Sequence, residues 1–466
     1  MPKQKDERWF LEETYTADLG DRRLNKRLSN MLEMLSRKPT GSIPAVSKGW
    51  DETKAAYRFF DNEAATLEKI LEPHIRATEE RISKEKVVLM PQDTTELDYS
   101  SKKQMRGLGK LNYENQLGMH LHTTLAVTPD RICLGVAHGE VLIREKLGGS
   151  NRSKLPIEQK ESMRWLNGYR VAQEIAKKYP DTKVVSLADR EGDIYDIFVE
   201  SQEAKGEGQA EWIIRAQQNR CLLEADEDKK RYKKLFKKIE EAAVVGVTEF
   251  NLPRIKNRKA RKVKQEIRTL AVTLKSPYRI EGKLPNVTIN AVFAKEINAP
   301  FGVEPIEWML LTSLPIETSE QALLVLEWYL CRWQVEIFFK VLKVGCEAEE
   351  LQFKTVDRLK PCLALYMIIA WRILYIMMLG RGCPEMPCNV VFEDEEWQAV
   401  YIVVCRRPPP QVPPSLDQMV RMVASLGGFL NRKGDGYPGP QTIWIGMQRN
   451  RDFVIAMEAQ NAISDT

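Results

Sequence analysis

The chain has 466 residues, of which 43% are hydrophobic and 29% are charged, and its formal net charge is +5. This length exceeds what one ordinary hydrophobic core accommodates and predicts about two to four domains. The sequence has neither a signal-like N-terminus nor an uninterrupted apolar run of about 20 residues, which excludes secreted and membrane-spanning classes, so we expect a soluble, cytoplasmic protein.

Residues 1–80 are predicted to be helical. The segment ADLGDRRLNKRLSNMLEML places apolar residues at helical spacing and basic residues in its first turns. A second segment, SKGWDETKAAYRFFDNEAATLEKIL, predicts two short helices in succession. Basic helices in a module of this size are typical of small DNA-binding domains, although a helical arrangement alone identifies no ligand.

From residue 86 the pattern changes to short β-branched runs bounded by Pro, Gly, Asp and Asn. The predicted strands lie at 86–90, 121–128, 132–143, 182–187 and 211–217, and a helix is predicted at 158–179. Further strand-like runs between 240 and 297 predict an all-β insertion, and IEWMLLTSLP (306–315) predicts a central strand. This mixture of strands and helices indicates a mixed α/β sheet.

The positive charge is concentrated in one segment. Between Lys229 and Lys264 there are 14 Lys and Arg residues against 3 Glu residues, a local net charge of +11 that leaves about −6 for the remaining chain. A concentrated basic segment in a balanced protein indicates a polyanionic partner. A solvated charged loop is the alternative.

Residues 318–343 are predicted to form one long helix that begins at an N-cap, Thr318 or Ser319. Most of this helix is apolar, but five polar residues interrupt it at steps of 3, 4, 4 and 3. They are Tyr329, Arg332, Glu336, Lys340 and Lys343. At roughly 100° per residue they occupy an arc of about 80° on one face. Ion pairs four residues apart would also explain such a stripe.

The C-terminal third is predicted to be helical at 362–380 and then irregular. Arg372 interrupts the apolar run CLALYMIIAWRILYIMML, so we expect a buried helix there. The segment RRPPPQVPPS (406–415) is typical of a polyproline-type linker. Two more helices are predicted in SLDQMVRMVASLGGFL and TIWIGMQRNRDFVIAMEA.

A zinc site is weakly indicated in two places. Cys383 and Cys388 are the closest pair among eight scattered cysteines, but no histidine is near them, so we expect free thiols. His120 and His122 share one strand face, and His138 lies on the next strand. These histidines could form a zinc hydrolase site, or they could face solvent or DNA.

Two carboxylates are predicted to lie just beyond buried strands: Asp93 follows VVLMPQ and Asp189 follows VVSLA. An aspartate there can be aimed into a site, but it is also an ordinary turn or N-cap residue. Glu336 adds a third carboxylate, on the helix after another central strand. Such an all-oxygen ligand set suits Mg²⁺ or Mn²⁺, and two ions about 4 Å apart support phosphoryl transfer. The basic residues around Glu336 would then hold DNA phosphates.

The spacing Tyr-(2)-Arg-(3)-Glu-(6)-Lys, with aspartates on two preceding strands, resembles the bacterial DDE cut-and-paste transposases of the insertion-sequence-four family, transposon-five type. Other motifs similar to that group occur along most of the chain. They are ADLGDRRLNKR, AYRF, KESMRWL, ADREGDI, WMLLTSLP and LGGFL.

The resemblance implies a ribonuclease-H-like core in which Asp93, Asp189 and Glu336 bind two Mg²⁺ ions, for which Mn²⁺ can substitute. It also implies that the phosphates near the transposon end are bound by Tyr329, Arg332, Lys340 and Lys343, and that Arg215 is an active-site arginine. Trp308 would stack against a flipped-out base. Arg23, Arg27 and Arg58 would be the N-terminal arginines that recognise the end. Gln217 and Met309 stand where the family has lysines, so two phosphate contacts differ.

The implied organisation is a helical transposon-end-binding domain at 1–80, a catalytic core at 81–361 with a β-rich insertion at about 218–305, and a helical dimerisation region at 362–466. The implied reaction is cut-and-paste transposition: a 3′ nick, hairpin formation, hairpin opening and strand transfer to target DNA by a homodimer. The implied location is the bacterial cytoplasm, on the nucleoid. A metal-dependent nuclease of the same fold and a non-catalytic DNA-binding inhibitor are the alternatives.

Overall fold

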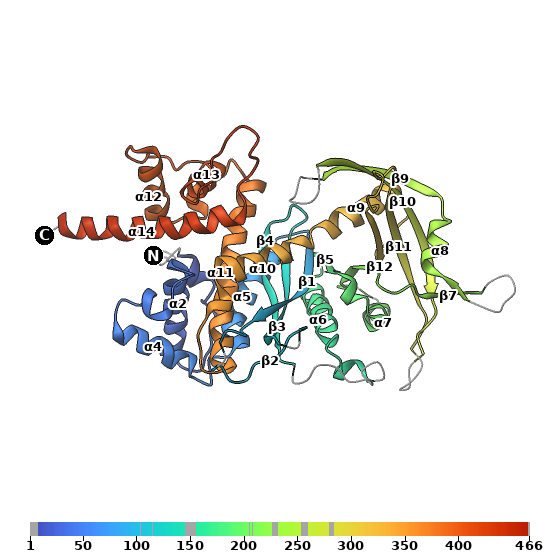
Figure 1. Cartoon of the computed structure of the whole chain (residues 1–466), viewed down its shortest axis with the longest axis horizontal. Coiled ribbons are helices and arrows are strands. Elements are labelled where there is room, and N and C mark those ends of the chain that lie inside the picture. The colour runs from blue at the N-terminus through green and yellow to red at the C-terminus, as the bar shows by residue number, and fades with distance from the viewer. Residues whose placement is uncertain are drawn as a thin grey trace. The chain divides into compact units, whose positions relative to one another are not determined.

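The computed structural model describes residues 8–102, 104–113, 115–144, 155–204, 206, 208–225, 232–252, 260–278 and 284–464. The chain forms two compact units, each built from separate segments. Unit 1 comprises Met1–Ile82, Thr94–Leu147 and Gln334–Thr466, and unit 2 comprises Ser83–Asp93 and Gly148–Trp333. Strand β1 (Val87–Asp98) and helix α10 (Trp333–Lys340) contribute residues to both units. Figure 1 labels both elements.

Unit 1 begins with five helices, which confirms the helical prediction for the described part of residues 1–80. They are α1 (Trp9–Glu12), α2 (Arg22–Arg37), α3 (Ile43–Val46), α4 (Trp50–Phe60) and α5 (Leu67–Ile82). Asp21 caps α2 by accepting a hydrogen bond of 2.7 Å from the Arg23 backbone N–H. The apolar face of α2 is buried through Leu28, Leu32 and Leu35, while its basic first turn stays exposed.

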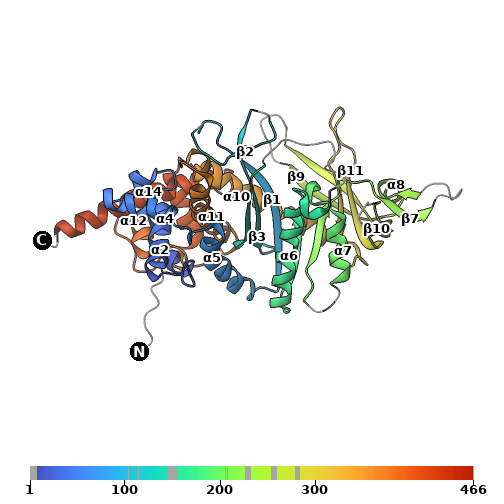
Figure 2. The same ribbon diagram turned by 90° about the horizontal axis from the view of Figure 1, so that it is seen from below.

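Helix α11 (Val356–Gly382) is the central core helix of unit 1 and packs against α2, α5 and strand β4 (Cys133–Leu142), as Figure 2 shows for the helices. It is long and apolar enough to cross a membrane, but 94% of its most apolar window is buried inside the protein. Arg372 is buried within it and donates to the Val391 carbonyl. The predicted buried helix is therefore confirmed.

The remaining parts of unit 1 are C-terminal helices and a small group of strands. The helices are α12 (Asp394–Cys405), α13 (Leu416–Leu426) and α14 (Pro440–Ser464), and the strands are β2 (Gly109–Lys110), β3 (Leu117–Val127), β4 and the second half of β1. The prediction of irregular structure after residue 380 is wrong at α12. A reciprocal capping box between Glu393 and Glu396 starts this helix, and Trp397 and Val400 bury its inner face.

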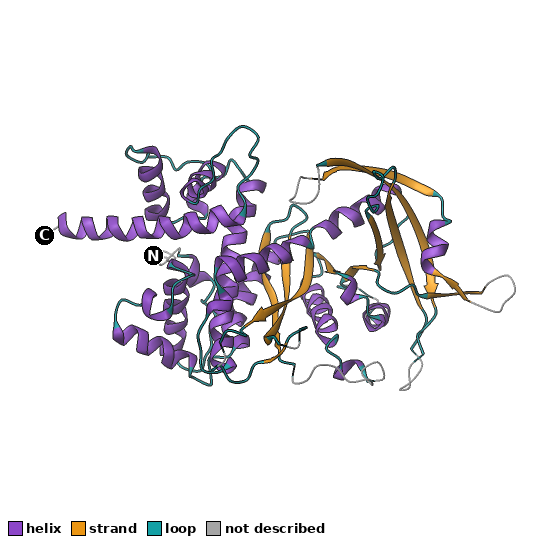
Figure 3. Ribbon diagram, viewed as in Figure 1, coloured by secondary structure: helices purple, strands orange, loops and turns teal. Residues whose placement is uncertain are grey.

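Unit 2 contains a mixed sheet with helices packed on it, which confirms the predicted fold class (Figure 3). The strand order is β1–β5–β6–β12–β11–β10; β7 and β9 also pair with β10, and β8 pairs with β7. The strands are β5 (Lys183–Ala188), β6 (Glu211–Arg215), β7 (Cys221–Ala225), β8 (Tyr232–Lys234), β9 (Val244–Leu252), β10 (Arg261–Leu274), β11 (Val287–Glu296) and β12 (Glu307–Thr312). The β1–β5 and β5–β6 pairs are parallel, and the other unit 2 pairs with a described register are antiparallel.

The helices of unit 2 are α6 (Met163–Lys178), α7 (Tyr195–Glu203), α8 (Leu235–Glu240) and α9 (Ser319–Leu330). Strands β7 to β11 form the predicted insertion between β6 and β12, although α8 makes it β-rich rather than all-β. The hydrophobic core joins the central strands to α9 through residues such as Val185, Leu310 and Leu326. The core therefore holds the strand ends of β1, β5 and β6 in a fixed register.

The predicted single helix at 318–343 is wrong, because the chain breaks it at residues 331–332. Thr318 caps α9 as predicted, with a capping box to Gln321. The Cys331 and Arg332 backbone N–H groups then bond to carbonyls three residues back, at 3.0 Å each. Helix α10 follows, and a π-helical turn (Val341–Gly345) follows α10. The five polar residues therefore do not form one stripe on a single helix.

Candidate active site

Asp93 and Asp189 leave neighbouring parallel strands at the same level. The last paired residues of β1 and β5 are Pro91 and Leu187, and each aspartate follows two residues later in the chain. The Asp189 backbone is still extended, with φ −80° and ψ −163°. Because side chains alternate with a period of two, this register, continued by two residues, predicts that both aspartates face the same side of the sheet.

The structure corrects one detail of this pair. Asp93 was expected just past the end of its strand, but β1 continues to Asp98 because its second half pairs with β3. What ends before Asp93 is the pairing with β5, which stops at Pro91. The carboxylate is therefore carried by a rigid strand beyond its partner, whereas Asp189 lies in a turn and accepts a hydrogen bond of 2.8 Å from the Glu191 backbone N–H.

Arg332 forms an ion pair with Asp93 inside unit 2. Its Nη1 lies 2.9 Å from Asp93 Oδ2, and the side chains are only 10% and 18% exposed. The break after α9 turns Arg332 inward instead of leaving it on an exposed helix face. The guanidinium therefore compensates the negative charge of the Asp93 carboxylate in a poorly solvated place.

Tyr329 and Arg215 lie in the same charged environment of unit 2. Burial raises the pKa of the Tyr329 hydroxyl, although Arg332 and Arg215 partly oppose this rise. Because the net pKa is raised, the hydroxyl stays protonated at neutral pH and can donate a hydrogen bond. Burial and then the neighbouring cation Arg190 lower the pKa of Arg215, with a smaller contribution from Arg332. Arginine remains protonated at neutral pH, so cations here surround the two aspartates. Arg190 was not singled out from the sequence, although its place directly after Asp189 was a signal.

The other residues of the predicted stripe belong to unit 1. Glu336 lies in the first turn of α10 and Lys340 in its last turn, and both side chains are exposed. Lys343 lies in the π-helical turn, where its Nζ donates to the Glu96 carbonyl at 2.8 Å and pairs with Glu349 at 3.0 Å. Helix α10 therefore presents a carboxylate and a lysine four residues apart, while Lys343 is held by its own unit.

Trp308 lies half-buried in β12, and its ring stacks on Phe250 with 5.9 Å between centroids and 10° between planes. It is therefore not a fully enclosed core tryptophan. Met309, where a lysine was expected from the resemblance, is buried and pairs with Phe293. Its side chain packs in the sheet, so a phosphate contact there is lost.

The N-terminal arginines lie on the exposed sides of α2 and α4. Arg23 is 94% exposed, Arg27 is half-exposed, and Arg58 is exposed in the last turn of α4. The predicted basic segment Lys229–Lys264 lies partly outside the described residues, since 229–231 and 253–259 are not among them. Its described lysines include Lys234 and Lys237, both exposed.

The donor chemistry of the paired aspartates fits a hard divalent cation, which prefers carboxylate oxygens. Among the described residues, however, no three His, Cys, Asp or Glu side chains lie close enough together to hold a metal ion. Asp93 and Asp189 belong to unit 2 and Glu336 to unit 1.

The zinc alternative at His120, His122 and His138 also lacks a three-ligand group within the described chain. There, His122 Nδ1 lies 2.9 Å from the Thr94 hydroxyl.

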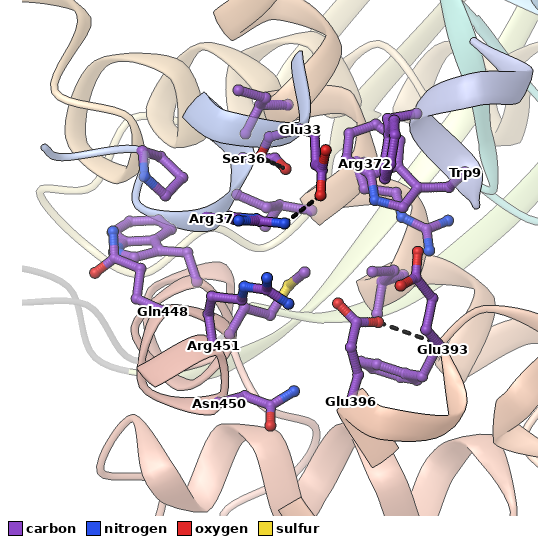
Figure 4. Close-up of a pocket in the computed structure, with 18 residues that line it drawn as sticks. Trp9, Glu33, Ser36, Arg37, Arg372, Glu393, Glu396, Gln448, Asn450 and Arg451 are labelled. Carbon is purple, nitrogen blue, oxygen red and sulfur yellow. Dashed lines mark hydrogen bonds and ion pairs between the residues drawn. The ribbon is translucent and has the colours of Figure 1, made fainter. Parts of the chain in front are cut away.

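A cavity of about 70 Å³ lies elsewhere in unit 1, between helices α1, α2, α11, α12 and α14 (Figure 4). Three arginines and three glutamates line it together with apolar side chains. Burial and the neighbouring Glu396 together raise the pKa of Glu393 to about 7. None of the three predicted catalytic carboxylates lines this cavity, so it is separate from the candidate site.

Comparison with known families matches most of the chain. Residues 6–65 match the family described as transposase DNA-binding, residues 174–371 match the transposase DDE domain, and residues 368–466 match the transposase Tn5 dimerisation domain. The second match covers Asp189 and Glu336, while Asp93 lies outside all three. These families identify a ribonuclease-H-like, divalent-metal-dependent DNA-cleaving enzyme that binds DNA and forms a homodimer. The chain belongs to the Tn5-type DDE transposases.

Proposed function

We propose that this transposase moves DNA by a cut-and-paste reaction in which Asp93, Asp189 and Glu336 together bind two Mg²⁺ ions, with Mn²⁺ as a substitute. The observation that carries the proposal is the register of β1 and β5, whose last pair, Pro91 and Leu187, lies two residues before Asp93 and Asp189. When bound, the ions would activate the attacking hydroxyl and stabilise the leaving oxygen at phosphorus. Nicking, hairpin formation, hairpin opening and strand transfer are all in-line displacements that one site can perform.

The chain's own residues then position the DNA. Tyr329 and Arg215 donate to phosphate oxygens beside the aspartates, and Lys340 and Lys343 hold the neighbouring phosphates. Arg332, which pairs with Asp93 in this structure, turns part of its guanidinium to the same phosphate. These contacts fix the scissile phosphate in line with the attacking oxygen.

Other residues recognise the transposon end. Trp308 offers a half-exposed indole on which a flipped-out base stacks while the DNA end forms a hairpin. Arg23, Arg27 and Arg58 contact the end from the N-terminal helices. In this proposal residues 1–80 bind the end, 81–361 form the core with the insertion at about 218–305, and 362–466 dimerise. The protein acts in the bacterial cytoplasm, on the nucleoid.

The test is cleavage of a labelled duplex carrying the element's own ends, in Mg²⁺ or Mn²⁺, by the wild type, Glu336→Ala and Trp308→Ala. We expect a 3′ nick and a hairpin from the wild type, neither product from Glu336→Ala, and a nick with little hairpin from Trp308→Ala. Glu327→Ala, an exposed change on α9, is the matched control and should cleave normally. Nicking of any duplex without hairpin or strand transfer would indicate a nuclease, and tight end binding without cleavage in either metal would indicate an inhibitor.

A further inference from the structure

Asp193 occupies a central position in the turn that follows Asp189. Its side chain is buried, and one oxygen, Oδ2, accepts the backbone N–H groups of Gln217 at 2.8 Å and Gln218 at 2.7 Å. The other oxygen, Oδ1, accepts from Arg220 Nε at 3.1 Å. Asp193 therefore joins the turn after β5 to the turn after β6 through charge-assisted hydrogen bonds.

Arg220 is fixed from several sides. It donates to the Asp193 carbonyl at 2.8 Å as well as to the Asp193 side chain. Its guanidinium lies 5.5 Å from the ring centroid of Tyr195 and 5.1 Å from that of Phe198, both on α7. The ion pair is shielded, because the Arg220 and Asp193 side chains are 11% and 0% exposed. Such a pair holds a definite geometry better than an exposed one.

The turn held by this pair connects two functional parts of unit 2. Immediately before it, Arg215 ends β6, and the Ala216 N–H bonds to the Met309 carbonyl at 2.8 Å. Immediately after it, the Arg220 carbonyl accepts from the Leu235 N–H at 3.0 Å, at the start of α8 in the insertion. Asn219 Oδ1 likewise accepts from the Phe236 N–H at 3.1 Å.

We infer that Asp193 and Arg220 act as a positioning pair for the transposition reaction. They set the turn 217–220, and through it Arg215 and the β-rich insertion, relative to the Asp189 turn. Neither residue touches the reacting atoms in this inference; they act through the turn. The inference rests on the proposed function, in which Asp189 is catalytic and Arg215 contacts the DNA.

Asp193→Asn is the informative variant because an amide keeps the volume but places an NH₂ group against a guanidinium or an N–H donor. In a single-turnover assay on the labelled end duplex, we expect its nicking rate constant to fall by about 10- to 100-fold. Its dissociation constant for the duplex and its half-saturating Mn²⁺ concentration should stay within about threefold of wild type. Arg220→Gln should show the same pattern, and the double variant should be no slower than the slower single variant. Asp181→Asn, an exposed change in the same unit, is the control.

A readout independent of cleavage is hydrogen exchange at the amides of Gln217 and Gln218. We expect these amides to exchange at least about tenfold faster in Asp193→Asn, with β5 and α7 unchanged. This result still tests the pair if the wild type fails to cleave, an outcome that would instead count against the proposed function. The inference would be overturned if Asp193→Asn nicked the duplex within twofold of the wild-type rate. Additive effects of the two single variants on the nicking rate would also overturn it. So would hydrogen exchange that rises throughout unit 2 together with a loss of duplex binding.

Discussion

Arg332 and Asp93 are a nearly buried ion pair placed where a cation-binding carboxylate is expected. Removing one partner of such a pair costs more than removing both, because the remaining charge loses its compensation in a poorly solvated place. The guanidinium of Arg332 compensates the charge of Asp93 in the free protein. Arg332 thus has two tasks, compensation of charge in the free protein and phosphate contact in the proposed DNA complex.

We predict that Arg332→Ala lowers the free energy of unfolding by about 2–4 kcal/mol. Millimolar Mn²⁺ should restore part of this loss, because a bound cation replaces the missing guanidinium. Denaturant unfolding with and without Mn²⁺ measures both effects. The double variant Arg332→Ala/Asp93→Asn is the matched control and should be more stable than Arg332→Ala alone. Equal stability of the single and double variants would contradict the predicted charge compensation.

A second buried charge network stabilises unit 1. His74 is fully buried, its Nδ1 lies 2.5 Å from Glu13 Oε2, and its Nε2 accepts from the Val136 N–H at 3.0 Å. Because Nε2 accepts, the proton of the neutral ring lies on Nδ1 and points at Glu13. Burial lowers the pKa of His74 and keeps the ring neutral. Burial alone would raise the pKa of Glu13, but His74 and Arg81 overcome it and lower that pKa to about 2.

A carboxylate whose folded pKa is depressed stabilises the fold above its unfolded pKa and loses this contribution as the pH falls through the folded value. We therefore predict that the melting temperature of unit 1 falls between about pH 4.5 and pH 2 through Glu13. Glu13→Gln should be less stable than wild type at pH 7 and should lose less on acidification. Glu12→Gln controls for the removal of a neighbouring charge. An acid transition unchanged in Glu13→Gln would show that other groups determine it.

The helices and strands differed in how well the sequence predicted them. Helix α2 was predictable because its apolar spacing matches the face that it buries, and α11 was predictable because a long apolar run indicates a buried helix. The break after Leu330 was not, because nothing in Cys331 or Arg332 excludes a helix and the break is stabilised by tertiary contact with Asp93. The continuation of β1 through Asp93 was missed for the same reason, as pairing with β3 extends it.

In the candidate site, too, some features could be predicted from the sequence and others depend on tertiary contacts. Motif spacing predicted Asp93, Asp189, Glu336 and the surrounding cations. Their local partners could not be predicted, because the hydrogen bonds of Asp193 and the ion pair of Arg332 join residues far apart in the chain. Helix α12 was also missed. Its N-terminal capping box uses glutamates, not the usual Ser or Thr, and its last turns are β-branched.

Helix α12 is capped at its N-terminus by a titratable residue, Glu393, whose effect on stability has the opposite pH dependence to that of Glu13. The pKa of Glu393 in the folded protein is raised to about 7. The protonated side chain therefore contributes fully to the stability of the fold below the unfolded pKa, and this contribution is lost as the pH rises toward 7. We predict that Glu393→Gln, which keeps an acceptor for the capping bond, melts higher than wild type at pH 8 and equally at pH 4.5. Glu395→Gln, exposed in the first turn, is the control. An unchanged slope of melting temperature between pH 5 and pH 7 would contradict this prediction.

In the whole molecule, the three proposed catalytic residues belong to two different compact units. Asp93 and Asp189 belong to unit 2, while Glu336 belongs to unit 1 with the N-terminal and C-terminal helices. The chain leaves unit 2 directly after Asp93 and again after Trp333, so these two crossings lie next to Asp93 and three residues before Glu336 in sequence. The proposed metal site therefore takes two carboxylates from unit 2 and one from unit 1.

The most direct test of this shared site is hydroxyl-radical cleavage of the protein backbone by bound Fe²⁺, which replaces Mg²⁺ and cuts the chain near its ligands. The full-length transposase would be incubated with its end duplex, Fe²⁺, ascorbate and peroxide, and the fragments mapped by mass spectrometry. We predict cuts near Asp93, Asp189 and Glu336 together, suppressed by excess Mg²⁺ and lost at all three places in Asp189→Asn. Cuts near the two aspartates that never include α10, or cuts only elsewhere, would contradict a site formed by all three carboxylates.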